Sequence, residues 1–230
     1  MVVWVFVGGG KSEVGGLIPF LRRNYKEHKF ERKSPVRQKP GPSPSSEPGY
    51  GRTGKSLADQ IGKLLSESLK GQEESNLILV IDDLDCHKPN ARQQLFATAV
   101  GQVGEANEIP CFVGLASPEI EAWIVADWGN TVAKDLDFRG CHQQMQHWLS
   151  TQGSVPFDDP ESFSHYDPDR NACHDKLSEA IVDSSIECCD RVRYSKATHT
   201  ARFLRQLSSD VVSQKCPLFR QLHARLSQPQ

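Results

Sequence analysis

The chain lacks any long hydrophobic run and any basic segment ahead of its short apolar N-terminal stretch. No apolar run approaches 18 residues, so the sequence predicts no membrane-spanning helix. The run Val2–Val7 is too short for a signal peptide and has no positively charged region before it. We therefore expect a cytoplasmic protein with no membrane association.

The sequence also lacks a cysteine framework. Its seven cysteines are an odd number, and no C-x2-C pair is present. Three Cys-His dipeptides, at residues 86–87, 141–142 and 173–174, invite a zinc interpretation, but adjacent side chains on a strand point to opposite faces. Ordinary reduced thiols in a cytosolic protein are the expectation.

The small net charge of −2 conceals a division along the chain. Residues 22–55 hold ten Lys/Arg and three Asp/Glu, residues 56–190 hold eight and 24, and residues 191–230 hold eight and one. The segment charges are therefore +7, −16 and +7. Basic segments on either side of an acidic middle are compatible with a polyanionic partner.

Three apolar runs alternate with amphipathic segments. Residues 2–7, 77–81 and 110–115 read as buried strands, and 13–24, 57–69 and 92–103 as helices. Another helix is expected from Glu119, with Ser117 as its N-cap, and Trp123 is expected in the core. Residues 28–32 are a weak further strand candidate. This alternation predicts an α/β fold with a mainly parallel sheet flanked by helices.

The domain organisation follows from composition. Residues 1–130 are expected to form the core, which residues 34–54, rich in Pro and Gly, interrupt as a flexible insertion. Residues 131–230 are expected to form a mainly helical C-terminal extension packed on that core.

Carboxylates gather where the predicted strands end. Glu13 follows the first strand, Asp82, Asp83 and Asp85 end the second, and Glu119 and Glu121 follow the third. Ligands bind at the carboxyl ends of strands in open α/β sheets, and clustered carboxylates suit Mg²⁺ or Mn²⁺. Such acids are also often helix caps or solvated loop residues. Lys11, in the glycine loop, is a candidate phosphate contact.

A nucleotide-binding alternative rests on Gly49 and Gly54-Lys55-Ser56, which match G-x4-G-K-[ST]. A P-loop must follow a strand, however, and this match follows a Pro-rich segment. A flexible glycine loop describes it better.

Four segments together resemble a known family. GGGKSEVGGLIPFL after a strand resembles the first Toprim motif, and LILVIDDLD resembles the Toprim D-x-D motif. SPEIEAWIVAD and the tail, with its Y-x-K and C-P-x-F patterns, are similar to a Toprim-like bacterial family that is catalogued as a domain of unknown function. That family is related to RloB and to the nuclease part of overcoming-lysogenization-defect proteins.

The resemblance implies a metal-dependent Toprim-like nuclease that acts on DNA or RNA in anti-phage defence, with an ABC-type ATPase as a possible partner. By this resemblance Glu13, Asp83 and Asp85 would be catalytic and bind metal, Glu121 would be the later acid, and Asp82 and Glu119 would be reserve ligands. Lys196 of the Y-x-K segment would be catalytic as a phosphate contact, or else a solvated surface lysine. A non-catalytic scaffold or sensor is the alternative function.

The basic tail offers further candidates. Arg202 and Arg205 lie at helical spacing in a segment almost without acids and could contact nucleic acid. A solvated helical face is the other interpretation of these residues.

Overall fold

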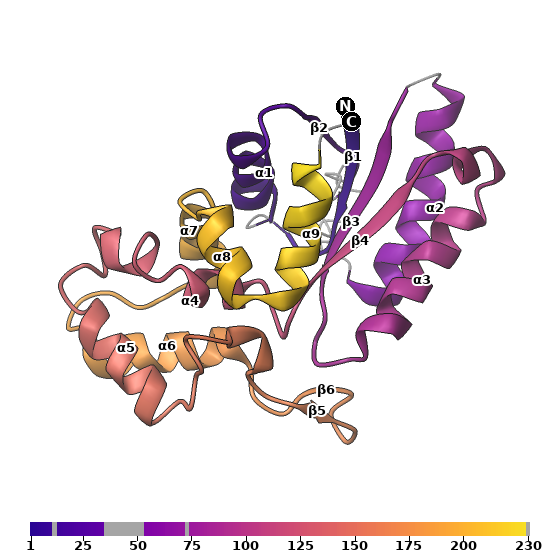
Figure 1. Ribbon diagram of the computed structural model, residues 1–230. Coiled ribbons are helices and arrows are strands. Elements are labelled where there is room, and N and C mark those ends of the chain that lie inside the picture. Colours follow the sequence, from indigo (N-terminus) through magenta and orange to yellow (C-terminus); the bar gives the residue numbers. More distant parts are fainter. Residues whose placement is uncertain (11–12, 35–52, 72–73, 229–230) are drawn as a thin grey trace, which may run out of the picture.

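The centre of the molecule is a parallel sheet. The computed structural model describes residues 1–10, 13–34, 53–71 and 74–228. Four strands, all parallel, lie in the order β2-β1-β3-β4 (Figure 1). They are β1 (Val2–Val7), β2 (Lys29–Arg32), β3 (Leu77–Asp83) and β4 (Cys111–Ala116). The predicted α/β fold with a parallel sheet flanked by helices is confirmed, and the weak strand candidate is the edge strand β2.

Helices make up most of the remaining described residues. Those before residue 130 are α1 (Ile18–Asn24), α2 (Gly54–Lys70), α3 (Pro89–Gly101) and α4 (Glu121–Ala126). The helical C-terminal region contains α5 (His142–Thr151), α6 (Leu177–Cys188), α7 (Ala201–Leu204), α8 (Ser209–Lys215) and α9 (Pro217–Ser227). Short π-helical turns, η1 (Glu13–Leu17) and η5 (Lys196–Thr200), precede α1 and α7, and a small antiparallel hairpin pairs β5 (Tyr166–Asp167) with β6 (Ala172–Cys173).

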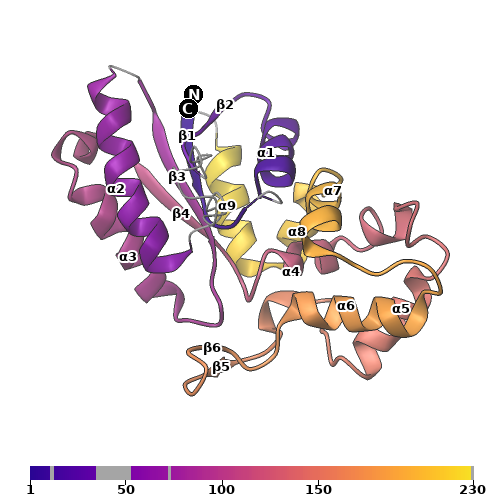
Figure 2. The same cartoon turned by 180° about the vertical axis from the view of Figure 1, so that it is seen from behind.

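Alternating side chains on the strands bury two different cores. Val3, Val5 and Val7 of β1 belong to the larger core, which includes residues of α1, α4, α7 and α9. Trp4 and Phe6 face the other way, into a smaller core with α2 and α3. Both faces of the sheet are therefore covered, which explains why the strands read as continuous apolar runs (Figures 1 and 2).

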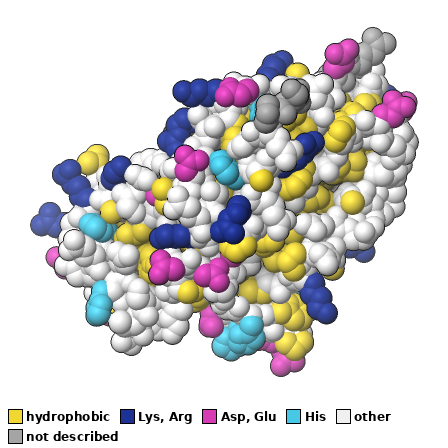
Figure 3. All heavy atoms as spheres, in the orientation of Figure 1, with side chains coloured by type: hydrophobic (Ala, Val, Ile, Leu, Met, Phe, Trp, Pro, Cys, Tyr) yellow, Lys and Arg dark blue, Asp and Glu magenta, His cyan; other side chains and the backbone are white. Residues whose placement is uncertain are grey.

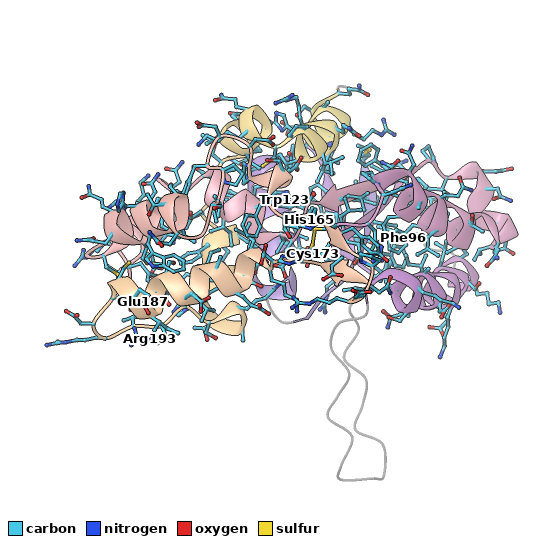
Figure 4. The ribbon with its side chains drawn as sticks, turned by 90° about the horizontal axis from the view of Figure 1, so that it is seen from below. Phe96, Trp123, His165, Cys173, Glu187 and Arg193 are labelled. Atoms are coloured by element: carbon cyan, nitrogen blue, oxygen red, sulfur yellow. A yellow bond between two sulfur atoms is a disulfide. The ribbon has the colours of Figure 1, made fainter. Side chains whose placement is uncertain are left out.

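The C-terminal helices share the larger core with the sheet. Trp123, fully buried, lies within 4.8 Å of Phe219 of α9 between ring centroids, and Leu222 of α9 packs against Gly114 of β4. Figure 4 shows Trp123 in the middle of the molecule and Phe96 on the side of α2 and α3. Residues after 130 thus complete the hydrophobic interior that the sheet begins.

The strand order changes direction between β1 and β3. From β1 the chain moves outward to β2, then returns past β1 to β3 and continues to β4. The connections after β1 and β3 therefore diverge at their carboxyl ends, which is where ligands bind in open α/β sheets. Glu13 follows one of these strands and Asp82 and Asp83 end the other.

Two local predictions are wrong. Helix α4 begins at Glu121 rather than Glu119, and Ser117 does not cap it, because the Ser117 hydroxyl donates to the Glu161 carbonyl at 3.0 Å. The expectation of seven reduced thiols also fails, because Cys86 is paired with Cys173 and Cys141 with Cys189. Both pairs join segments far apart in sequence, and only the fold reveals that they meet. The disulfide of Cys173 is visible in Figure 4.

Within the residues that the structure describes, every helix is too short or too polar to traverse a lipid bilayer.

Candidate functional site

Consecutive aspartates at the end of β3 point to opposite faces of the sheet. Asp82, only 2% exposed, accepts a hydrogen bond from the Gly54 N–H at 3.0 Å and lies 3.4 Å from the Arg92 guanidinium. Burial raises the pKa of Asp82 to about 7, although Gly54 and Arg92 act in the other direction. Asp82 therefore caps α2 on the face opposite Asp83, and it shares Arg92 with Asp85.

Asp83 lies on the other face, beside α4. Its Oδ1 accepts the Ile120 N–H at 2.8 Å, which ties the end of β3 to the start of α4. Burial raises the pKa of Asp83 well above its usual value; the Lys196 ammonium opposes this effect, and the Glu121 and Glu119 carboxylates add to it. Asp83 thus belongs to one electrostatic cluster with two glutamates and a lysine.

Lys196 is the cation of that cluster. Its Nζ lies 3.0 Å from Glu121 Oε2 and 3.5 Å from Glu119 Oε1. Burial lowers the pKa of Lys196, but the charges of Glu121, Asp83 and Glu119 more than offset that effect and hold it above the ordinary value. The lysine is consequently an ammonium ion at any physiological pH. We call Asp83, Glu119, Glu121 and Lys196 the acid–lysine cluster.

Glu121 is the most enclosed member of the acid–lysine cluster. It is 0% exposed, and its Oε1 accepts hydrogen bonds from the Thr200 hydroxyl at 3.0 Å and the Tyr194 hydroxyl at 3.3 Å. Burial raises the pKa of Glu121, and Lys196 opposes this rise. The importance of Tyr194 could be suspected from its place in the Y-x-K segment, but no sequence signal marks Thr200.

Glu119 also has a structural task. Its carboxylate accepts the Ser178 N–H at 2.9 Å and the Ser178 hydroxyl at 3.2 Å, in the first turn of α6. Asp127 accepts the Ser208 N–H at 2.7 Å before α8, and Glu161 accepts the Leu218 N–H, also at 2.7 Å, in α9. Carboxylates at helix N-termini satisfy N–H groups that have no partner inside the helix. Part of the acidic middle of the chain therefore serves to dock C-terminal helices.

Asp85 lies apart from Asp83, in the loop after β3. Its backbone is left-handed, with φ 49°, and its carboxylate is 3.9 Å from the Arg92 guanidinium. Burial raises the pKa of Asp85, Arg92 opposes the rise, and Glu119 adds to it. The two aspartates of the D-x-D motif therefore share an electrostatic environment but have different direct partners.

Glu13 can be placed only by its backbone. It begins η1, at the carboxyl edge of β1; its side chain, like the whole of Lys11, lies outside the described residues. Two residues of η1 lie against α7: a Cβ at Gly16 would be only 2.8 Å from Ala201, and one at Gly15 would be 3.5 Å from it. The GG pair of the first motif thus allows η1 to approach the helix that follows the Y-x-K segment.

The two predicted nucleic-acid arginines have partners within the chain. Arg202 Nε lies 2.7 Å from Asp135 Oδ2, and its guanidinium also contacts Asp137. Arg205 donates to the Gly15 carbonyl. On the face in Figure 3, Lys and Arg side chains are interspersed with acidic ones. A contact of Arg202 or Arg205 with nucleic acid stays a prediction.

The P-loop-like match falls partly at the start of α2. Residues 49–52 lie outside the described residues. The Gly54 N–H donates to Asp82, and the Ser56 hydroxyl donates to the Thr53 carbonyl at 3.0 Å. At Gly54 the structure therefore places a carboxylate where a P-loop would hold a phosphate.

The acid–lysine cluster has the donor chemistry of a divalent-cation site. Its three carboxylates outnumber the one ammonium, and hard oxygen ligands suit Mg²⁺ or Mn²⁺. Among the described side chains, however, no three His, Cys, Asp or Glu are arranged to hold one ion. The carboxylates therefore suit such an ion in donor type and in charge. In the structure the ammonium of Lys196 balances part of their negative charge.

Comparison with known proteins assigns a family to the chain. A search of curated proteins and of solved structures found no significant match. One family model, described as Domain of unknown function (DUF4276), matches residues 10–227, which include β3, α4 and the Y-x-K segment. The chain therefore belongs to the DUF4276 family.

Proposed function

We propose that this protein is a Toprim-like, divalent-metal-dependent nuclease that acts on DNA or RNA. The observation that carries the proposal is the acid–lysine cluster at the carboxyl edge of the sheet. There Lys196 Nζ lies 3.0 Å from Glu121, and the charges of Lys196 and Glu121 both act on Asp83. Three carboxylates and one ammonium leave an excess of negative charge at a site where Glu119 and Glu121 are buried and the Lys196 side chain is 40% exposed. Such an excess favours a bound cation or bound protons.

Asp83 and Glu121 would hold the metal ion, together with Glu13 from the adjacent end of β1. A bound Mg²⁺ or Mn²⁺ activates a water molecule and stabilises the leaving oxygen of a phosphodiester. Lys196 supplies a fixed positive charge beside these carboxylates, which can contact a phosphate oxygen and lower the charge repulsion that a nucleic acid meets. Glu119 keeps Lys196 in place while it caps α6.

The wider setting is proposed from the sequence resemblance. We infer kinship with RloB and with the nuclease part of overcoming-lysogenization-defect proteins, a role in anti-phage defence beside an ABC-type ATPase, and a cytoplasmic location. The cysteines test the location. If the location is cytoplasmic, protein quenched with acid directly from the cell should have seven free thiols, because a reducing compartment would open the two disulfides of the structure. Three free thiols, the number that the two disulfides leave, would instead indicate an oxidising compartment.

The test of the activity is cleavage of a panel of single- and double-stranded DNA and RNA with Mg²⁺, with Mn²⁺ and with chelator. The comparison is between the wild type and Asp83→Asn, which keeps an acceptor for the Ile120 N–H. Asp127→Asn is the matched control, because Asp127 likewise accepts a backbone N–H at the start of a helix but has no contact with Lys196 among the residues described. Metal-dependent cleavage that Asp83→Asn abolishes and Asp127→Asn retains supports the proposal. Equal cleavage by all three proteins refutes it.

A non-catalytic scaffold or sensor is the second candidate, and one observation favours it. Asp82, Asp83 and Glu119 each accept a backbone N–H at the start of a helix, so each acid has a structural task without a metal. This candidate predicts that calorimetry finds no binding of Mg²⁺ or Mn²⁺ with a dissociation constant below about 1 mM, and that no substrate is cleaved. Binding of nucleic acid or of a partner ATPase without turnover would then define its role.

A further inference from the structure

Two hydroxyl groups from the C-terminal region converge on one oxygen of Glu121. Thr200 Oγ1 donates to Glu121 Oε1 at 3.0 Å, and the Tyr194 hydroxyl lies 3.3 Å from the same oxygen. The two hydroxyls are also hydrogen-bonded to each other. Because each has a single proton, the Thr200 proton goes to Glu121, and the Tyr194 proton is shared between Thr200 and the carboxylate.

The other oxygen of Glu121 has a different environment. Oε2 lies 3.0 Å from the ammonium of Lys196, on the side of Glu119 and Asp83. One oxygen is therefore held by neutral donors and the other faces the charged site. Rotation of the carboxyl group would break contacts on both sides, so the hydroxyls determine which oxygen Glu121 presents to the acid–lysine cluster.

The donors themselves are held rigidly. Tyr194 is 3% exposed, its N–H donates to the Ser185 hydroxyl at 2.8 Å, and its ring stacks on His199 and Phe203. His199 is fixed in turn, because its Nδ1 accepts the Ser195 N–H at 2.7 Å.

We propose that Tyr194 and Thr200 are positioning residues for Glu121, and that the segment from Tyr194 to Thr200 completes the active site from the C-terminal region. The inference rests on the proposed nuclease function and specifies how its carboxylate is oriented. A pre-organised carboxylate binds a cation without first having to be ordered. Residues that orient a metal-binding group change metal affinity or activity about 10–100-fold when they are removed.

The experiment measures Mn²⁺ binding by calorimetry, together with the turnover number, KM and the Mn²⁺ concentration for half-maximal cleavage, in the wild type and four variants. Thr200→Val removes the hydroxyl with little change of shape, Thr200→Ser restores it, and Tyr194→Phe removes only the phenol oxygen. Tyr25→Phe is the matched control, because Tyr25 is similarly buried, at 4% exposed, and its hydroxyl is hydrogen-bonded, at 2.9 Å, to His223 rather than to the site. Urea denaturation of each variant separates loss of folding from loss of function.

The expected result is at least about a tenfold lower turnover number and a higher Mn²⁺ requirement in Thr200→Val and Tyr194→Phe, with KM for nucleic acid nearly unchanged. Thr200→Ser and Tyr25→Phe should resemble the wild type. Wild-type turnover and Mn²⁺ dependence in both Thr200→Val and Tyr194→Phe would overturn the positioning role alone. A wild type that neither binds Mn²⁺ nor cleaves would instead overturn the proposed function, and the positioning role with it.

Discussion

Replacing Gly16 by alanine probes the contact between η1, which follows β1, and α7, which follows the Y-x-K segment. A Cβ at Gly16 would lie 2.8 Å from the Cα and the carbonyl oxygen of Ala201 and 2.9 Å from Leu204 Cβ. Ordinary contacts begin at 3.4 Å, so η1 and α7 would have to separate by about 0.6 Å. Overpacking of this kind costs about 1–3 kcal/mol, and we expect the upper half of that range because two of the three atoms belong to the backbone.

Gly62→Ala is the matched control. Gly62 lies in the interior of α2, and no described atom beyond its own helix neighbourhood lies within 4 Å of its Cβ position. Alanine there should stabilise the protein by about 1 kcal/mol, because glycine is a poor helix former. Urea denaturation should therefore place the two variants about 3 kcal/mol apart, on opposite sides of the wild type. A Gly16→Ala protein as stable as Gly62→Ala would refute the packing of η1 on α7.

Three further predictions concern stability. Burial raises the pKa of Glu161 to about 7 from 4.5, so the folded protein holds a proton that the unfolded chain has lost between these values, and stability should fall as pH rises from about 4.5 to about 7. This fall in the free energy of unfolding is at most about 3 kcal/mol, and Glu161→Gln should remove it. If urea denaturation gives Glu161→Gln the same loss of stability between pH 5 and pH 8 as the wild type, this assignment is contradicted. Arg202→Ala leaves Asp135, 3% exposed, without its ion pair and should cost about 2 kcal/mol, whereas Ala at the exposed Arg191 should cost almost nothing; equal losses would disprove the role of the pair. Reduction of the Cys86–Cys173 and Cys141–Cys189 bonds should lower the free energy of unfolding by about 2–4 kcal/mol per bond, and an unchanged midpoint with dithiothreitol would exclude both pairs.

The fold could be predicted from the sequence where burial leaves a periodic trace. The central strands β1 and β3 are buried on two faces, so each is an unbroken apolar run that can be read without a structure. Strand β4, at one edge of the sheet, is buried only in its second half, but its residues are also an apolar run. Edge strand β2 has four residues, with one buried, and its pattern is correspondingly weak. Cysteine pairing left no such trace, because the partners are 87 and 48 residues apart and local spacing does not determine which thiols meet.

The site could be predicted only in part, because sequence position does not tell which way a carboxylate points or what it binds. Asp82 and Asp83 are neighbours in the chain, yet strand alternation directs one to Arg92 and the other to Lys196. The partner of Glu119 in α6 is 59 residues away, so its capping role was one of two open alternatives. Thr200 lies 79 residues from Glu121, and only the packing of the C-terminal region brings them together.

The most direct test of the account is anomalous diffraction from crystals of the wild-type protein soaked in Mn²⁺. The central claim is that the carboxylates beside Lys196 form a divalent-cation site at the carboxyl edge of the sheet, where the connections after β1 and β3 diverge. It predicts an anomalous peak within coordination distance, about 2.0–2.3 Å, of carboxylate oxygens of Asp83 and Glu121. Crystals soaked at saturating Mn²⁺ that have no peak there, with Lys196 still the only cation beside Glu121, would contradict it.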